Sequence, residues 1–412
     1  MTEPRALFSA VGVELEYMIV GQHDLNVAPI ADVLLAEAVG EPAADFEDGP
    51  VTWSNELVAH VIELKTGKPA ASFEGWTQRF QESVEHVNRR LAAHGAKLLP
   101  TAMHPWMNPD QETKLWPLEN SEVYQTFDRI FNCRGHGWSN LQSVHLNLPF
   151  ANDAEFARLH AAIRLLLPLL PALAASSPLR DGQATGLLDN RLEAYRHNSA
   201  RIPQVAGLIV PEPVYSAAEY QRLILHPLYA AIAPFDPDSV LQEEWLNARG
   251  AIARFDRQTI EIRVLDIQEC PAADLALLTL IVAVLKSLVA ETWTPLPLQQ
   301  THATAPLHAI FLATLAQAGE VQLEDPAYTS HFGYAGPLPC TVQQLWADLM
   351  ERHSQAGSAV AQCRPALDVV LQHGCLARRI MTALGTGWGP EELRNVYGRL
   401  ADCLATGNLF RP

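Results

Sequence analysis

The sequence predicts a protein that combines α-helices with β-strands, and two patterns lead to this prediction. Apolar residues recur at helical spacing over residues 72–94, 152–175, 216–232, 272–292 and much of 341–405. Between these segments lie four short runs in which apolar and polar residues alternate, as they do in strands with one buried face. We therefore expect helices together with strands that are apolar on one face and polar on the other.

Composition indicates a globular protein with a large core. The chain has 412 residues, of which 48% are hydrophobic and 18% are charged, and its net charge is −17. This negative charge argues against a nucleic acid as a partner, because nothing would offset the repulsion from a phosphate backbone. No repeat of solenoid period and no low-complexity linker divides the chain, so we expect a single domain over 1–412, strand-rich at about 8–270 and helical at about 271–412.

Cellular location is expected to be the cytoplasm. The six cysteines form no Cys-x-x-Cys pair, and the chain begins without an apolar run behind a basic start. Two apolar stretches, Leu165–Ala175 and Leu275–Ala290, are interrupted by prolines and by Lys286 respectively. Both are shorter than the roughly 20 apolar residues that cross a bilayer, so we expect buried helices and no membrane partner.

The first two alternating runs carry carboxylates on their polar faces. In residues 10–19 the polar face holds Gly12, Glu14 and Glu16, opposite a face of valine, leucine, tyrosine and isoleucine. In residues 60–66 the polar face holds Glu63 and Lys65. Each run is predicted to form a strand whose apolar face enters the core.

The other two runs add an imidazole, an amide and a guanidinium. In residues 143–148, Ser143, His145 and Asn147 face away from three apolar residues. In residues 259–264, Thr259, Glu261 and Arg263 do the same. Any one of these runs would also suit an ordinary half-exposed strand with no chemical role.

Together the four runs predict a divalent-metal site. If the strands are neighbours, which the sequence does not establish, their four glutamates would repel one another unless cations neutralise them. Oxygen-rich ligation favours Mg²⁺ or Mn²⁺, and the single histidine is compatible with Mn²⁺. The predicted metal ligands are Glu14, Glu16, Glu63, His145 and Glu261.

The same residues resemble a known family, the glutamate–cysteine ligases and their relatives the carboxylate–amine ligases. A second stretch also resembles that family: Ser177-Pro178, Thr185-Gly186, Arg191 and Tyr195. The matches follow the family order from about residue 11 to 270. The motifs are Gly12-Val13-Glu14-Leu15-Glu16-Tyr17, Val61-Ile62-Glu63-Leu64, Val144-His145-Leu146-Asn147 and Ile260-Glu261-Ile262-Arg263-Val264-Leu265-Asp266.

The resemblance implies an α+β fold of the glutamine synthetase/guanido kinase type, with a curved, mainly antiparallel sheet packed by helices. It implies an enzyme that uses ATP, with Mg²⁺ or Mn²⁺, to phosphorylate a carboxylate. An amine then attacks the resulting acyl phosphate. By this resemblance Glu261 and Arg263 would be catalytic, and Arg191 and Tyr195 would bind the acid substrate. Arg254, Arg263 and Asn147 would contact ATP phosphates.

Three residues lie outside the clear motifs. Arg254 precedes a predicted hairpin through 256–258 that would pair it beside the Glu261 strand. Glu56 lies seven residues before Glu63, either as a further ligand or as an exposed acid. Arg379 has only a loose counterpart in the family, so a phosphate contact and a place on a helix surface both stay open.

The resulting hypothesis is an ATP-dependent ligase that joins the γ-carboxylate of L-glutamate to an amine, with cysteine the first choice. One alternative is the same chemistry on another acid or amine. Another alternative is a paralogue that binds metal or nucleotide without turnover. Small molecules are the expected partners, and the sequence leaves the oligomeric state open, a homodimer included.

Overall fold

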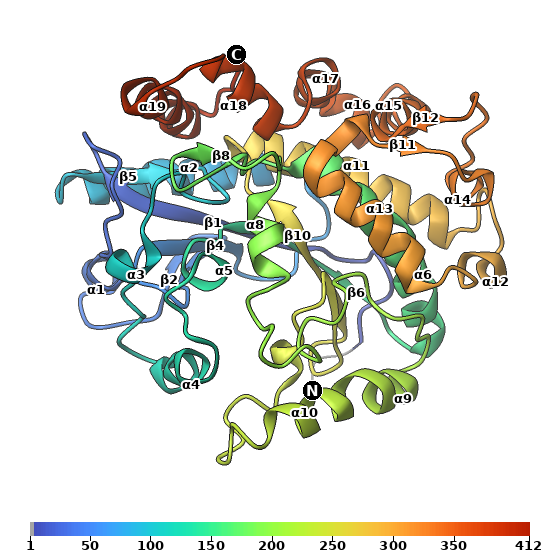
Figure 1. The fold of residues 1–412 in the computed structure, drawn as a ribbon, viewed down its shortest axis with the longest axis horizontal. Helices are drawn as coiled ribbons and strands as arrows, with labels where there is room; N and C mark the ends of the chain where they lie inside the picture. The colour runs from blue at the N-terminus through green and yellow to red at the C-terminus, as the bar shows by residue number, and fades with distance from the viewer. Residues whose placement is uncertain (1–3) are drawn as a thin grey trace.

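A central eight-stranded sheet organises the computed structural model, which describes residues 4–412 (Figure 1). Residues 1–3, which belong to the N-terminal segment without an apolar run behind a basic start, lie outside the described residues. Seven strands follow the order β2-β3-β4-β1-β6-β10-β9, and β5 also pairs with β1. All ladders of this sheet are antiparallel, as predicted. The strands are β1 (Gly12–Gly21), β2 (Asp45–Asp48), β3 (Val51–Asn55), β4 (Val61–Thr66), β5 (Ala96–Leu99), β6 (Ser143–Pro149), β9 (Ala251–Arg254) and β10 (Thr259–Asp266).

All four strands predicted from alternation are present, as β1, β4, β6 and β10. They are consecutive in the sheet, in the order β4-β1-β6-β10. The adjacency that the sequence left open is therefore confirmed. Two short hairpins lie outside this sheet: β7 (Leu179–Arg180) with β8 (Gln183–Ala184), and β11 (Gln322–Leu323) with β12 (Cys340–Thr341).

Helices supply the second part of the α+β architecture. The long predicted helical segments become α2, α6, α11 and the group α15 to α19, which lies along one edge of the view in Figure 1. The helices are α1 (Ala31–Val39), α2 (Trp76–Ala92), α3 (Pro109–Glu112), α4 (Ser121–Phe131), α5 (His136–Ser139), α6 (Asp153–Leu166), α7 (Pro171–Ala174), α8 (Asn190–Tyr195), α9 (Ala217–Tyr220), α10 (His226–Ile232), α11 (Pro271–Val289), α12 (Leu296–Gln299), α13 (Thr304–Gln317), α14 (Pro326–Ser330), α15 (Val342–His353), α16 (Ala359–Gln362), α17 (Arg364–His373), α18 (Leu376–Leu384) and α19 (Pro390–Thr406).

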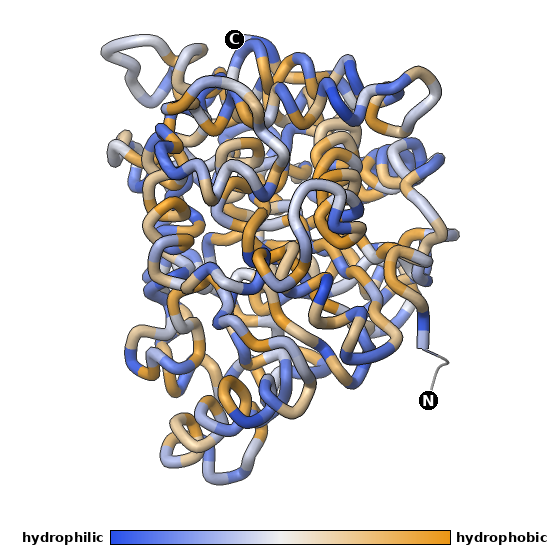
Figure 2. Tube along the Cα trace, turned by 90° about the vertical axis from the view of Figure 1, so that its right-hand side faces the viewer, coloured by the Kyte–Doolittle hydropathy of each residue, from blue (hydrophilic) through white to orange (hydrophobic). Residues whose placement is uncertain are grey.

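Four shorter helical turns complete the described residues 4–412. The 152–175 segment contains a 3₁₀ turn at Leu167–Leu169, where Pro168 and Pro171 interrupt the regular helix. A π-helical turn at Gln221–Leu225 joins α9 to α10, and two further 3₁₀ turns lie at Glu244–Leu246 and Ala318–Glu320. In Figure 2 hydrophobic and hydrophilic positions alternate along the trace, the pattern of elements with one inner and one outer face.

The apolar side of the sheet forms the core with α2, α6 and α11. Leu15 and Tyr17 on β1 have no exposed surface, and they share one hydrophobic cluster with Phe80 of α2 and Phe156 of α6. Each fully buried side chain of this size stabilises the fold by roughly 1.5–3 kcal/mol. The opposite side of the same strands is thereby free to hold the polar residues.

Helix α11 is the most apolar long helix of the chain. By length and composition it could cross a membrane, but 72% of its most apolar window is buried inside the molecule. It contacts α2, α6, α15, α16 and α17. This is the environment of a core helix, as the interruption at Lys286 predicted.

Candidate active site

The polar faces of β4, β1, β6 and β10 form one continuous surface. Across β1 and β6, Glu14 lies opposite His145 and Gly12 lies opposite Asn147. On the other side of β1, Glu16 lies opposite Glu63, and across β6 and β10 Asn147 lies opposite Glu261. Side chains on paired positions point to the same side of a sheet, so the register brings the predicted ligands together.

Glu14 is the best-partnered carboxylate of this surface. Its Oε2 lies 2.9 Å from Nδ1 of His145, and its Oε1 accepts a hydrogen bond of 3.0 Å from Nδ2 of Asn147. Burial alone would raise the pKa of Glu14, but the hydrogen bond and charge of His145 outweigh it and lower the pKa to about 2. Burial alone would lower the pKa of His145, but Glu14, Glu16 and Glu261 together raise it to about 9.

Two neighbouring carboxylates are less well compensated. Burial and the charge of Glu14 raise the pKa of Glu63 well above its ordinary value, although Nζ of Lys65 lies 2.9 Å away. Burial and the charge of Glu16 likewise raise the pKa of Glu56 to about 8. Glu56, which the sequence left open, therefore belongs to the electrostatic environment of the cluster. The site holds more buried carboxylates than its own cations neutralise.

A divalent cation fits this donor set. One ligand atom from each of Glu14, Glu63 and His145 lies within 4.8 Å of the other two. Two carboxylates with one imidazole suit Mg²⁺ or Mn²⁺, and a bound cation would remove the repulsion that raises the carboxyl pKa values. Glu16 is held beside this group by the Ser143 N–H and hydroxyl, which donate to its Oε2 at 2.7 and 3.0 Å.

Glu261 and Arg263 form the opposite border of the cluster. Nε of Arg263 donates to Oε1 of Glu261 at 3.0 Å, and the same oxygen lies 3.7 Å from Nδ1 of His145. Glu261 and then Tyr195 raise the pKa of Arg263 against the effect of burial. The hydroxyl of Tyr195 is buried near this guanidinium and makes no well-aligned hydrogen bond among the described residues.

Arg254 lies at the outer end of the site. It pairs with Thr259 across β9 and β10, which confirms the predicted hairpin. Its guanidinium contacts Asp256 at 2.9 Å, and its side chain is 8% exposed. A phosphate contact by Arg254 stays a prediction.

Two other predicted arginines lie inside the protein. Arg191 is 2% exposed, and its guanidinium pairs with Asp266 and reaches the carbonyl of Arg263. Arg379 has no exposed surface; it pairs with Glu269 and donates to the Phe410 carbonyl at 2.7 Å. The place on a helix surface that the sequence left open for Arg379 is wrong, because its guanidinium is enclosed by internal partners, whereas a phosphate contact by Arg379 stays a prediction. The sequence carried no signal of Glu269 as that partner.

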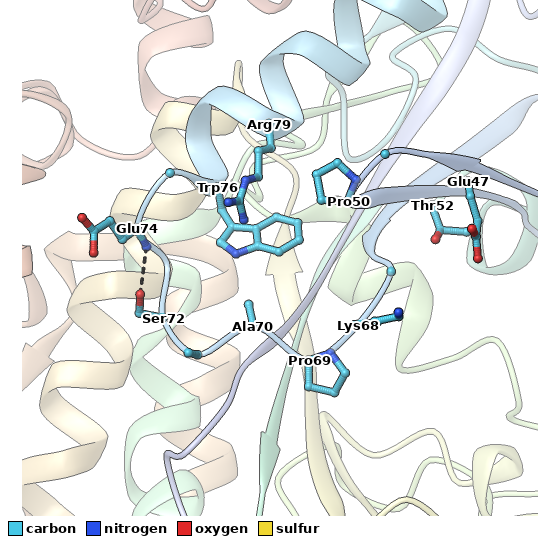
Figure 3. A pocket seen from close by; sticks show the side chains of 14 residues that line it. Glu47, Pro50, Thr52, Lys68, Pro69, Ala70, Ser72, Glu74, Trp76 and Arg79 are labelled. Carbon is cyan, nitrogen blue, oxygen red and sulfur yellow. Dashed lines mark hydrogen bonds between the residues drawn. The ribbon is translucent and has the colours of Figure 1, made fainter.

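One cavity adjoins the polar surface, and a second lies next to the first. The first, of about 470 Å³, reaches Glu14 and Asn147 and is lined also by Lys65, Lys68 and Gln258. It shares residues 67–69 with a second cavity of about 780 Å³, drawn in Figure 3. The sequence did not single out Lys68 and Gln258, which lie in turns after β4 and before β10 and follow no strand pattern.

The second cavity lies beside the start of α2. In Figure 3 the side chains of Trp76 and Arg79 face Pro50 and Pro69 across the opening. The Arg79 guanidinium carbon lies 5.0 Å from the centre of the Trp76 ring. Trp76 and Arg79 therefore form a cation–π pair on this side of the cavity.

Two known proteins are similar to this chain in sequence. A protein of Archaeoglobus fulgidus named "Uncharacterized protein" is 37% identical over 281 residues, covering 68% of this chain and 75% of its own. A Ruegeria pomeroyi protein named "Putative glutamate--cysteine ligase 2" is 25% identical over 63% of this chain and 60% of its own length. The aligned segment thus spans less than two thirds of that ligase-named relative.

Two solved structures share the fold. The glutamate–cysteine ligase of Francisella tularensis, in complex with AMP, has a TM-score of 0.59 at 12% identity and covers 98% of this chain and 90% of its own. A bifunctional glutathione synthetase from Pasteurella multocida has a TM-score of 0.63 at 14% identity, covering 97% of this chain and 53% of its own. The profile of glutamate–cysteine ligase family 2 matches residues 10–398. The chain therefore belongs to glutamate–cysteine ligase family 2 and is an ATP-dependent carbon–nitrogen ligase.

Proposed function

We propose that this protein activates the γ-carboxylate of L-glutamate as an acyl phosphate and couples it to an amine, cysteine being the first candidate. ATP would supply the phosphoryl group, and ADP and phosphate would be released. A carboxylate needs this activation because its leaving group would otherwise be oxide. The observation that carries the proposal is the joint surface of Glu14, Glu63 and His145, whose ligand atoms lie within 4.8 Å of one another.

The acidic residues would hold the cation and, next to it, the phosphates of ATP. Glu14, Glu63 and His145 form the first group, with Glu16 and Glu261 beside them. A bound Mg²⁺ or Mn²⁺ supplies positive charge that neutralises phosphate oxygens and orients them. Orientation and charge neutralisation are the main contributions that phosphoryl transfer needs from a protein.

The nucleotide would occupy the cavity of about 470 Å³ that reaches Glu14. Lys65 and Lys68 border this cavity, and Asn147 lies at its inner end beside Glu14. Ammonium and amide donors of this kind suit phosphate and ribose oxygens. Arg254 lies opposite Thr259 across the hairpin of β9 and β10 and would contact a phosphate of ATP.

Arg263 would stabilise the phosphoryl group during transfer. Its guanidinium lies on the same face as the metal-site carboxylates and is held by Glu261. A fixed guanidinium beside developing negative charge needs little reorganisation during the reaction. The buried hydroxyl of Tyr195 lies near this guanidinium and would contact the acid substrate. Arg191 as a direct carboxylate ligand stays a prediction from the family resemblance.

The test is phosphate release from ATP with Mg²⁺, with and without L-glutamate, against a panel of amines. Release that needs both glutamate and cysteine, with γ-glutamylcysteine in the product, supports the proposal as stated. Release that needs another acid or amine keeps the ligase chemistry and replaces the substrates. The control is Glu41→Gln, an exposed acid away from the cluster, which should turn over like the wild type.

The absence of both nucleotide binding and turnover would contradict the proposal, and it would support the non-catalytic paralogue if the folded protein still binds Mg²⁺ or Mn²⁺. All five predicted metal ligands are present and lie on one surface of the sheet, which favours the catalytic alternative.

A further inference from the structure

Strand β10 contains an irregularity at Arg263. Ile262 pairs with Leu146 and Leu265 pairs with Val144, so two residues of β10, Arg263 and Val264, lie opposite the single residue His145. An extra residue of this kind is a β-bulge, which bends the strand and redirects side chains. The bulge therefore determines where the guanidinium of Arg263 points.

The backbone of Arg263 is held from one side by a buried arginine. Nη1 and Nη2 of Arg191 both lie 3.4 Å from the Arg263 carbonyl oxygen. Nε of the same guanidinium donates to Oδ1 of Asp266, at the end of β10. Arg191 and Asp266 are 2% and 1% exposed respectively, so this contact is shielded from water.

Asp266 is in turn fixed by the segment that follows α7. Its Oδ2 accepts the Ser176 N–H at 2.8 Å and the Ser177 hydroxyl at 2.9 Å. The Ser177 hydroxyl also accepts the N–H of Arg191 at 3.1 Å. A buried carboxylate with this many donors is fixed in place and in turn fixes its partners.

Gly250 holds the other side of the bulge. The Arg263 N–H donates to the Gly250 carbonyl at 3.0 Å. A Cβ at position 250 would come within 2.5 Å of Cγ1 of Val264, so the close approach of this segment requires glycine. The peptide groups on both sides of Arg263 are therefore fixed by buried partners.

We propose that Arg191 and Asp266 are positioning residues, which clamp the β10 bulge and so aim the Arg263 guanidinium at the phosphoryl group. This inference rests on the proposed function for the role of Arg263, but the clamp itself is a property of the fold. It assigns Arg191 an indirect role, in contrast to the direct substrate contact that the family resemblance implies.

The geometry favours the indirect role. All three guanidinium nitrogens of Arg191 have protein partners, and its side chain is 2% exposed. A substrate carboxylate would have to displace Asp266 from a buried ion pair. Leaving a buried charge without its partner is strongly unfavourable, and one new contact of the same kind would not compensate for it.

The first test is a double-mutant cycle between Arg191→Lys and Arg263→Ala, read as kcat and KM of substrate-dependent phosphate release. Arg191→Lys alone should lower kcat roughly 10- to 100-fold, the cost of misplacing a catalytic group by about 1 Å, with little change in KM. In the Arg263→Ala background the same change should have almost no further effect, because the two residues act as one unit. Asp266→Asn should behave like Arg191→Lys.

The second test does not depend on activity. Hydrogen exchange of the full-length protein should accelerate in the β10 peptide around 261–266 in Arg191→Lys, because the contact to the Arg263 carbonyl is weakened. The matched control is Arg164→Lys, another fully buried arginine, which binds the Pro211 carbonyl outside the site. Its substitution should leave both β10 exchange and kcat as in the wild type.

The outcomes separate the two hypotheses. A higher KM for the acid in both backgrounds, with unchanged β10 exchange, would overturn the clamp and restore Arg191 as a substrate ligand. Suppose that β10 exchange is faster in Arg191→Lys but the wild type turns over no substrate. This outcome would support the clamp and contradict the proposed function. Unchanged β10 exchange in Arg191→Lys would overturn the clamp whatever the activity.

Discussion

Glu14 and His145 lie directly opposite each other on neighbouring antiparallel strands, with 2.9 Å between Oε2 and Nδ1. Glu14 is the third residue of β1 and His145 is the third residue of β6. The two residues are 131 positions apart in the sequence. Their contact places an acid and an imidazole at the centre of the polar surface, where both can reach the same cation.

Glu63 is expected to matter for function more than for folding. Glu63→Gln removes a candidate metal ligand and also relieves repulsion that raises the pKa of this carboxyl. We expect ATP turnover to fall at least 100-fold, by analogy with the loss of one fixed charge-stabilising group, while the metal-free protein unfolds at an equal or higher urea concentration. A lower urea midpoint combined with full turnover would contradict this assignment.

Divalent cations are expected to stabilise the protein through the same cluster. A ligand that binds only the folded state adds about 2.7 kcal/mol at 100 times its Kd. Melting temperature should therefore rise with Mn²⁺ or Mg²⁺ in the wild type and in Glu41→Gln, but much less in His145→Ala. An equal rise in all three proteins would indicate binding elsewhere.

Tyr195 offers a test of the acid pocket. Its buried hydroxyl has no partner among the described residues, so Tyr195→Phe should leave the free energy of unfolding unchanged or slightly increased. If the hydroxyl contacts the acid substrate, KM for that acid should rise about 10-fold, the value of one hydrogen bond of about 1.4 kcal/mol. Steady-state kinetics at varied acid concentration check this, and an unchanged KM would remove Tyr195 from the pocket.

Acid sensitivity is expected from His104. Burial lowers the pKa of His104 to about 4, and Nε2 lies 2.8 Å from the Leu25 carbonyl. An unfolded histidine titrates near 6.5, so below that pH the unfolded chain binds the proton first. Stability should be complete above pH 6.5 and should decrease as the pH falls toward 4, by roughly 3 kcal/mol for this residue.

Urea unfolding of His104→Gln at pH 7 and pH 4.5 measures this contribution. The variant should be less stable at pH 7 but lose less stability on acidification than the wild type. His23→Gln, at an exposed histidine, should retain the wild-type pH dependence. Equal pH dependence in all three proteins would contradict the assignment to His104.

Arg379 is expected to act on stability alone. Arg379→Ala leaves Glu269 buried without its partner, so the free energy of unfolding should fall by about 3–5 kcal/mol. Replacing both residues by apolar ones of similar size should restore much of that loss. Nucleotide affinity, measured by calorimetry in either variant that remains folded, should match the wild type. A selective loss of nucleotide affinity would return Arg379 to the phosphate site.

Alternation in the sequence predicted the four central strands and the face on which each polar residue lies. The period of a strand is two, so a run such as 10–19 specifies its buried face without any partner. The helical segments and the core role of α11 also followed from local periodicity. The chemical character of the site was therefore readable from the residue types on those faces.

Only the tertiary structure decided which strands are neighbours and which residues meet across them. Register depends on contacts between segments far apart in the chain, and the pairing of Glu14 with His145 is one result. The sequence likewise did not determine the ion-pair partners of Arg191 and Arg379, because a guanidinium pairs with whichever carboxylate the fold places beside it. Asp266 buries Arg191 and Glu269 buries Arg379, whereas Arg263, on the same strand face as Glu261, pairs with that carboxylate at the polar surface.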